Sequence, residues 1–258
     1  MLGYRLAVLG TLSLLAWPSG STKISHTHNA TIESASAAMV VRTAEGARLA
    51  GRAALRGFAP KAVSIHMEGD RNCASQHQDP VYLQQVEVNE QAGLRNVFVW
   101  VKQGLERETF QPPSTQVILD QKGCMYLPRV LGIQTGQKLK ILNSDPAMHN
   151  VHPIPRQNVE WNLSQPPNGF PLVKTFEHAE VMVRVMCNIH PWMRAYIGVV
   201  SHPYFVVTPA DGSFEIKGLP PGEYTLAAWH ETLGTQEQKV LVEANETKRV
   251  QFVFSPRQ

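Results

Sequence analysis

The feature that most constrains this fold is a series of short strand-like runs separated by turn residues. No long segment shows sustained 3.6-residue periodicity, and 18 prolines with 18 glycines in 258 residues favour many turns over long helices. We therefore predict an all-β protein with at most a short helix in a loop. The runs are AGRAAL (50–55), KAVSIHM (61–67), RNVFVWVKQ (95–103), TQVILDQ (115–121), GQKLKILN (136–143), LVKTFE (172–177), VMVRVMC (181–187) and RAYIGVVS (194–201).

One of these runs is apolar on both faces. Val97, Val99 and Val101 alternate with Phe98 and Trp100, so neither set of side chains is suited to water. This pattern predicts a strand buried between two layers, as in a β-sandwich.

The character of the chain changes after Pro203. An Asp211-Gly212 turn between two apolar runs is a strong hairpin signal, and a second turn follows at 220–222. We predict a main domain over residues 46–203 and a small β module over residues 204–258. A module of that size has a marginal core, so we expect it to pack on the larger domain.

The first residues have the layout of a secretory signal peptide. Arg5 precedes an apolar run from Leu6 to Trp17, and small residues with a helix breaker follow it. We predict a signal peptide over residues 1–21 and a flexible lead-in over 22–45; the alternative is an uncleaved anchor. The mature protein is then expected to be exported and soluble, without a membrane span. A net charge of +3 without a basic cluster gives no reason to expect nucleic acid binding.

The chain has three cysteines, Cys73, Cys124 and Cys187. Export would place them in an oxidising compartment, and an odd number leaves one thiol unpaired. Cys187 lies beside His190 and Met193 and has the clearest reason to remain a thiol, so we expect a disulfide between Cys73 and Cys124. Sequence alone does not fix this pairing, and the alternative for Cys187 is a buried, unreactive thiol.

The segment around Cys187 carries the strongest chemical signal. Cys187, His190 and Met193 follow one another at steps of three, directly after a predicted strand, and Pro191 stiffens the loop between them. Upstream, His149 follows another predicted strand and an NSDP turn. Two histidines, one cysteine and a weak axial methionine form the ligand set of a blue copper site. Taken alone, His149 would be read as an ordinary surface or core histidine.

Other side chains are assigned supporting roles. We expect Asn150 to tie the two ligand loops together. We expect an exposed edge of His190, with Trp192 beside it, to form an electron port and docking patch; the alternative for Trp192 is a position between the two modules. For the remaining conspicuous histidines we favour bystander or structural roles. These are His152, His202 and His230.

Two segments resemble known families. AMHNVH and CNIHPWMRAYIGVV resemble the copper loops of amicyanin, a plastocyanin-like cupredoxin, although Asn188 and Ile189 replace the residues usual between Cys and His. The resemblance implies a Greek-key β-sandwich with His149, Cys187, His190 and Met193 as ligands. DGSFEIKGLPPGEYTL resembles carboxypeptidase regulatory-like domains of the transthyretin type, often called carbohydrate-binding-like, which are small Ig-like sandwiches. The whole architecture resembles exported bacterial proteins of the methylamine utilization type.

The sequence therefore predicts a periplasmic protein with one type 1 copper that carries an electron between Cu(I) and Cu(II). We expect redox proteins as partners and no enzymatic turnover. Two alternatives remain: a periplasmic copper carrier that uses the same ligands, and a scaffold whose C-terminal module binds a glycan or protein while the copper site is vestigial.

Overall fold

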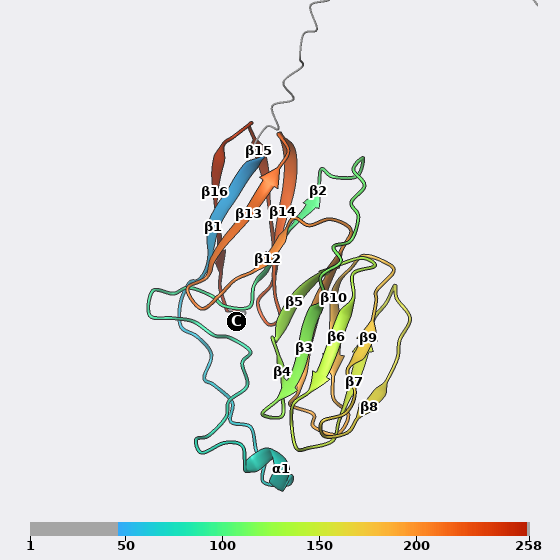
Figure 1. Cartoon of the computed structure of the whole chain (residues 1–258). Coiled ribbons are helices and arrows are strands. Elements are labelled where there is room, and N and C mark those ends of the chain that lie inside the picture. The colour runs from blue at the N-terminus through green and yellow to red at the C-terminus, as the bar shows by residue number, and fades with distance from the viewer. Residues whose placement is uncertain (1–45, 257–258) are drawn as a thin grey trace, which may run out of the picture. The chain divides into compact units, whose positions relative to one another are not determined.

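The computed structural model describes residues 46–256, which form sixteen strands and one short helix (Figure 1). The strands are arranged in four sheets, so the predicted all-β class is confirmed. The predicted signal peptide and the predicted lead-in lie outside the described residues. No helix within residues 46–256 has the length and apolar character needed to cross a membrane.

The first sandwich consists of a four-stranded and a five-stranded sheet. The four-stranded sheet has the order β4 (Met125–Leu127), β3 (Val117–Lys122), β6 (Leu139–Asn143), β9 (Leu172–Lys174). The five-stranded sheet has the order β5 (Val130–Gln134), β11 (Arg194–Val200), β10 (Glu180–Met186), β7 (His149–Ile154), β8 (Leu163–Gln165). The largest wholly buried side chains of their shared core include Tyr126, Phe176, Leu119, Ile133, Leu139 and Ile141.

Several connections of this sandwich cross from one sheet to the other. β4 and β6 lie in one sheet, whereas β5 and β7 lie in the other, and β9 and β10 are divided in the same way. Crossing connections of this kind characterise Greek-key sandwiches. They bring the start of β7 and the loop between β10 and β11 to the same end of the sandwich.

The second sandwich draws its strands from both ends of the described chain. One sheet has the order β13 (Ser213–Leu219), β1 (Ala47–Leu55), β16 (Thr247–Phe254). The other has the order β12 (Phe205–Val207), β2 (Phe98–Gln103), β14 (Gly222–His230), β15 (Gly234–Val242). The Asp211-Gly212 turn joins β12 to β13, which lie in different sheets, so it does not form the predicted hairpin.

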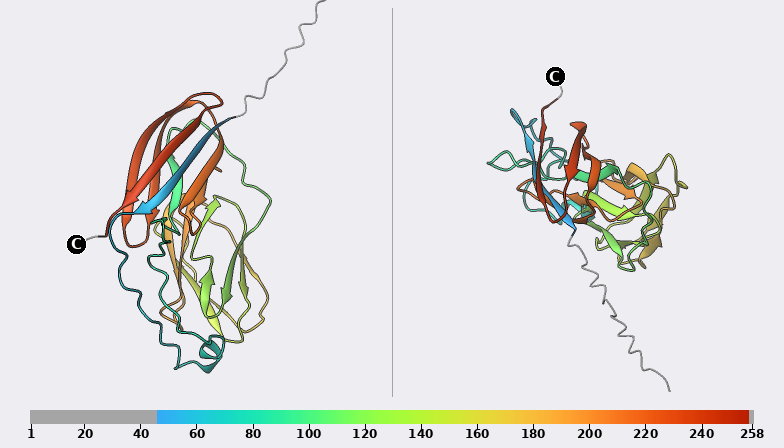
Figure 2. Two further views of the ribbon diagram at one scale, coloured as in Figure 1. Left: turned by 90° about the vertical axis from the view of Figure 1, so that its left-hand side faces the viewer. Right: turned by 90° about the horizontal axis from the view of Figure 1, so that it is seen from above.

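The predicted boundary between residues 203 and 204 does not match these sheets. β1 pairs in parallel with β16 along its length and antiparallel with β13, and β2 pairs with β12 and β14 (Figure 2). β1 lies between β13 and β16, and β2 lies between β12 and β14, so the C-terminal strands alone leave a gap in the middle of both sheets. The second sandwich is therefore discontinuous in sequence.

The two apolar faces of β2 have separate partners. Val99 and Val101 are buried in the core of the second sandwich, while Phe98 and Trp100 pack against β5 and β11 of the first. A Cβ atom at Gly198 in β11 would lie 2.4 Å from the Phe98 ring, so only glycine fits there. The predicted burial of β2 between two layers is confirmed. One layer belongs to the first sandwich and the other to the second.

Residues 56–91, here called the strap, connect β1 to β2 by way of the far end of the first sandwich. The predicted strand over 61–67 is absent; the strap has one isolated bridge between Ser64 and Tyr82 and another from Val88 to Leu94. Its only helix is α1 (Arg71–Ala74), whose first amides are capped by the Asp70 carboxylate. The strap is attached through three side chains buried in the core of the first sandwich, Ile65, Met67 and Cys73.

Candidate metal centre

His149 is the first residue of β7 and is completely buried. The preceding turn is held by Asn143 at the end of β6, whose amide donates to the carbonyl oxygens of Ala147, Gln165 and Pro166. This turn places Asp145 beside the imidazole, with Oδ2 2.7 Å from Nε2 of His149. The carboxylate accepts the Nε2 proton, which directs the lone pair of Nδ1 to the other side of the ring.

The loop from Cys187 to Met193 joins β10 to β11. The Cys187 amide donates to the carbonyl oxygen of Met193 (3.2 Å), and the Met193 amide donates to that of His190 (2.9 Å). The His190 amide in turn points at Sγ of Cys187, at 3.4 Å. These contacts fold the loop back on itself, so the three-residue spacing brings Cys187 and His190 together.

The predicted contact of Asn150 between the two ligand loops is present. Its Oδ1 accepts from the amide of Asn188 at 2.7 Å and lies 3.3 Å from Sγ of Cys187. Its Nδ2 donates to Asn162 at 2.6 Å, and its carbonyl oxygen accepts from the hydroxyl of Tyr126, also at 2.6 Å. Asn150 therefore fixes the distance between the start of β7 and the loop after β10.

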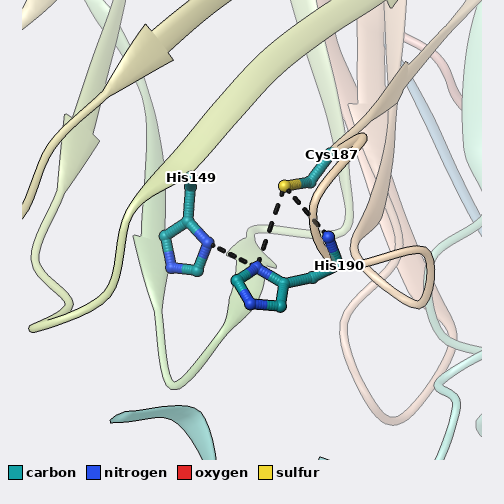
Figure 3. A group of neighbouring side chains, drawn as sticks. All are labelled: His149, Cys187 and His190. Atoms are coloured by element: carbon teal, nitrogen blue, oxygen red, sulfur yellow. Dashed lines mark hydrogen bonds between the residues drawn. The ribbon is translucent and has the colours of Figure 1, made fainter. Parts of the chain in front are cut away.

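The side chains of His149, Cys187 and His190 converge in the buried interior (Figure 3). Each contributes one potential ligand atom, and these atoms all lie within 4.8 Å of one another. Nδ1 of His149 is 2.9 Å from Nδ1 of His190, which is 3.9 Å from Sγ of Cys187. Met193 is fully buried in the same core cluster as Cys187. The structure thus brings together two imidazoles and a thiol.

The charges of this group are coupled. Burial opposes ionisation, but the hydrogen bonds to Asp145 and Cys187 outweigh it and raise the pKa of His149 to about 9. Burial also opposes formation of the Cys187 thiolate, yet the contact with His149 and nearby amides lower the pKa of Cys187 to about 7. Asp145 has its pKa lowered because the same imidazole and two amides outweigh its burial. The site therefore favours a thiolate, a good ligand for soft metals.

The outer edge of His190 is covered, contrary to our expectation of an exposed port. The residue is 2% exposed, and its Nε2 lies 3.0 Å from Oδ2 of Asp70 and 3.5 Å from Sγ of Cys73. Both partners belong to the strap, which sequence reading did not place near the site. Trp192 lies beside the ring at 5.1 Å between centroids and is partly exposed.

The predicted disulfide between Cys73 and Cys124 is present, and it joins the strap to the first sandwich. Cys187 is the free, buried cysteine. The carbonyl oxygen of Cys124 accepts from the indole nitrogen of Trp192 at 2.9 Å, and the amide of Cys124 donates to Asp145 at 2.8 Å. Through Cys124, the disulfide is therefore linked to Trp192, which lies beside His190, and to Asp145, which bonds to His149.

Sequence reading missed Asp70 and Asp145. The signal for Asp145 was available, because an acid four residues before a ligand histidine can reach its ring across a turn. Asp70 offers no comparable signal, since it is 120 residues from His190.

The other conspicuous histidines lie apart from this group. His152 bonds to Asn188 and Glu160, and His202 bonds to the carbonyl oxygen of Val101. Within residues 46–256, none of the metal-ligand groupings includes His152, His202 or His230.

Comparison with known proteins supports one of the two family resemblances directly. The sequence model of the carboxypeptidase regulatory-like domain matches residues 191–255. This range begins earlier than the predicted module and includes β11, which belongs to the first sandwich. No curated protein matches the chain.

Solved structures give more distant likenesses. A Cu-containing nitrite reductase from Thermus scotoductus SA-01 aligns with TM-score 0.30 and 23% identity, over 36% of this chain and 26% of its own. A Cu(I) form of an amicyanin variant aligns with TM-score 0.30 and 22% identity, over 34% of this chain and 86% of its own. A second amicyanin variant, in its reduced form, aligns with TM-score 0.29 and 23% identity, over 36% of this chain and 87% of its own. Such scores do not establish a shared function, and the likeness to methylamine utilization proteins stays a prediction.

Proposed function

We propose that this chain is an exported mononuclear copper protein that carries one electron between redox partners. The observation that supports this most is the convergence of His149, Cys187 and His190 in a buried pocket, with their donor atoms within 4.8 Å of one another. In proteins, two imidazoles and a thiolate with a soft thioether nearby are characteristic of copper electron-transfer sites. We assign the thioether to Met193, which is buried in the same cluster.

The residues present fit a copper ion. Asp145 accepts the proton on Nε2 of His149, which leaves Nδ1 as a ligand atom, and the low pKa of Cys187 favours its thiolate. A copper ion held by these ligands would supply the Cu(I)/Cu(II) couple. The chain itself restricts movement of the ligands, because Asn150 links their two loops and the Met193 amide closes the second.

Burial of the site favours electron transfer over metal exchange. A carrier that passes copper to an acceptor needs an accessible ligand, whereas His149 and Cys187 are completely buried and His190 is 2% exposed. The scaffold alternative treats the site as vestigial, yet all four predicted ligands are retained and three of them converge. We therefore keep both alternatives as outcomes of the test below.

Because the strap covers His190, we assign the electron port to Trp192. Its ring contacts His190 and also lines a cavity of about 420 Å³ together with Ile65, Leu83 and Pro191. An aromatic ring that links the metal ligand to a surface cavity provides a short path for an electron. We propose that the redox partner docks there.

The visible absorption spectrum after addition of Cu(II) tests this function. We expect an intense thiolate-to-copper band that disappears on reduction and is absent from Cys187→Ser. His178→Gln is the matched control, because His178 is an exposed histidine whose bonds to Asn158 are made by its backbone; the band of this variant should be unchanged. Copper binding without this band would favour the carrier, and no binding would favour the scaffold; either result would overturn electron transfer.

The exported location is part of the same proposal. It is supported by the apolar run over residues 6–17 and agrees with the disulfide between Cys73 and Cys124, since disulfides persist in oxidising compartments. Mass analysis of the mature protein from the periplasm would show whether residues 1–21 are removed.

A further inference from the structure

The disulfide between Cys73 and Cys124 joins two further groups of side chains that could bind a metal. The ligand atoms of Asp70, Cys73 and His190 lie within 4.8 Å of one another, and so do those of Cys124, Asp145 and His149. Because the two sulfur atoms are bonded to each other, the two groups are adjacent. As a disulfide, this sulfur pair is a poor ligand, whereas as two thiolates it would be a strong one.

The members of this group differ in access to solvent. Cys73 and Cys124 are completely buried, whereas the side chain of Asp70 is 31% exposed. Asp70 is therefore the member of this group that solvent and a dissolved cation can contact. The Asp70 carboxylate is well placed to hold it, because its Oδ1 caps α1 and is fixed by the amides of Asn72 and Cys73.

We propose that reduction of this disulfide creates a second metal site, which binds a divalent thiophilic cation such as Zn²⁺ through Cys73, Cys124 and Asp70. Two thiolates and a carboxylate are accepted ligands of zinc, and water can take the fourth position. This site is separate from the proposed copper site and does not require copper to be present.

Asp145 is not assigned as a ligand. Its oxygens accept from the amides of Gly123 and Cys124 and bond to Nε2 of His149, so its lone pairs are largely used. His190 is also left out, because its Nε2 proton is directed at Asp70 while Nδ1 faces the first site. Asp70 is consequently the side chain through which a cation at the second site would affect the first.

The chemical change is a simple exchange. A dithiol reductant breaks the bond between the two sulfur atoms, gives two thiols and is itself oxidised to a disulfide. Binding of the cation then releases the two thiol protons to solvent. The strap keeps its other attachments in this state, namely the buried side chains of Ile65 and Met67 and the contact of 2.8 Å between His77 Nε2 and the carbonyl oxygen of Gly123.

Cd²⁺ titration of the Cys187→Ser variant tests the proposal, because that variant lacks the thiolate of the first site. The protein is reduced with a phosphine, which is oxidised to the phosphine oxide with an oxygen atom from water. The reagent is then removed under anaerobic conditions. We expect the reduced variant to bind one Cd²⁺ with a near-ultraviolet thiolate-to-metal band, and the disulfide form to show no such band. Absence of the band after reduction would overturn the proposal.

Two further variants test the assignment of Asp70 in the same reduced background. Asp70→Asn should weaken Cd²⁺ binding by roughly tenfold or more while keeping the band. Asp79→Asn, an exposed residue of the same strap, is the matched control and should leave binding unchanged. Equal binding in both variants would overturn Asp70 as the third ligand.

The wild-type chain gives a second measurement that does not depend on how Cys187→Ser folds. Its Cd²⁺ stoichiometry should rise by one on reduction, and an unchanged stoichiometry would overturn the second site. Failure of the second site can be distinguished from failure of the proposed copper function, because the test of that function uses Cu(II) and the protein with its disulfide intact.

Discussion

The two histidines of the candidate metal centre are supported by different parts of the chain. His149 bonds to Asp145, which is fully buried, lies four residues away and is held by the amides of Gly123 and Cys124. His190 bonds to Asp70, which is partly exposed and lies in the strap. The inner support belongs to the core of the first sandwich, whereas the outer support is a separate segment fastened by a disulfide.

This difference shows how one buried site can combine rigidity with control. The inner support forms whenever the first sandwich folds, because the β6–β7 turn is part of that sandwich. The outer support contributes no strand to either sandwich, so we expect the pairing of the β-sheets to persist when its bond to His190 is lost. We therefore expect changes in the inner support to affect folding, and changes in the outer support to affect access to the site.

The largest expected effect comes from removing the disulfide with Cys73→Ala and Cys124→Ala together. The bond closes a loop between residues 51 apart in sequence, and its loss should lower the free energy of unfolding by about 4 kcal/mol. Urea denaturation would measure this loss. Core amides of β10 and β11 that exchange through global unfolding should lose protection by no more than this change in unfolding free energy, whereas amides of the strap should also exchange faster through local opening. A larger loss of protection in β10 and β11 would contradict the separation of the two supports.

Asp145→Asn should produce the next largest effect. The substitution removes the buried carboxylate whose hydrogen bond and charge help to raise the pKa of His149 to about 9. Leaving a buried charge without its partner should cost about 3 kcal/mol of unfolding free energy. The control is Asp120→Asn, which removes a carboxylate bonded only to the exposed hydroxyl of Ser144 and should cost less than about 1 kcal/mol. Similar losses in the two variants would argue against a special role for Asp145.

The same contrast explains which parts of the site could be predicted from sequence. Cys187, His190 and Met193 lie within seven residues of one another, and His149 and Asn150 adjoin a predicted strand. Ligand type and local spacing were sufficient to predict that His149, Cys187 and His190 lie together. The predicted disulfide correctly linked Cys73 in the strap to Cys124, but the contact of Asp70 with His190 could not be predicted, because these residues are 120 positions apart.

The fold shows the same limit. Alternation and turn residues predicted the strands and the all-β class, because both depend on neighbours in the sequence. The domain boundary failed because β1 is paired with β16, about 200 residues later, and that pairing leaves no local pattern. The two apolar faces of β2 did signal two buried layers, but they could not identify which layers those were.

Trp192→Phe should have a smaller effect. It keeps an aromatic ring beside His190 but removes the hydrogen bond from the indole nitrogen to the Cys124 carbonyl oxygen, which should cost about 1 kcal/mol of unfolding free energy. If the port is correctly assigned, electron exchange with a small redox reagent should also slow, as measured by stopped-flow absorption. Trp161→Phe is the control, since Trp161 packs under Lys174 and away from the port. Equal rates in both variants would contradict the port.

The smallest effect on stability is expected from Asp70→Asn with the disulfide intact. The side chain is partly exposed, and asparagine can still cap α1 with its Oδ1 atom, so the unfolding free energy should fall by less than about 1 kcal/mol. The side-chain amide of asparagine accepts a hydrogen bond from the His190 imidazole less well than the carboxylate does. The His190 ring proton should therefore exchange with solvent faster, as followed by NMR. A loss as large as that of Asp145→Asn would show that the strap is part of the folding core. A small loss with faster exchange would instead establish that the outer support protects His190 without contributing much to the stability of the sandwich beneath it.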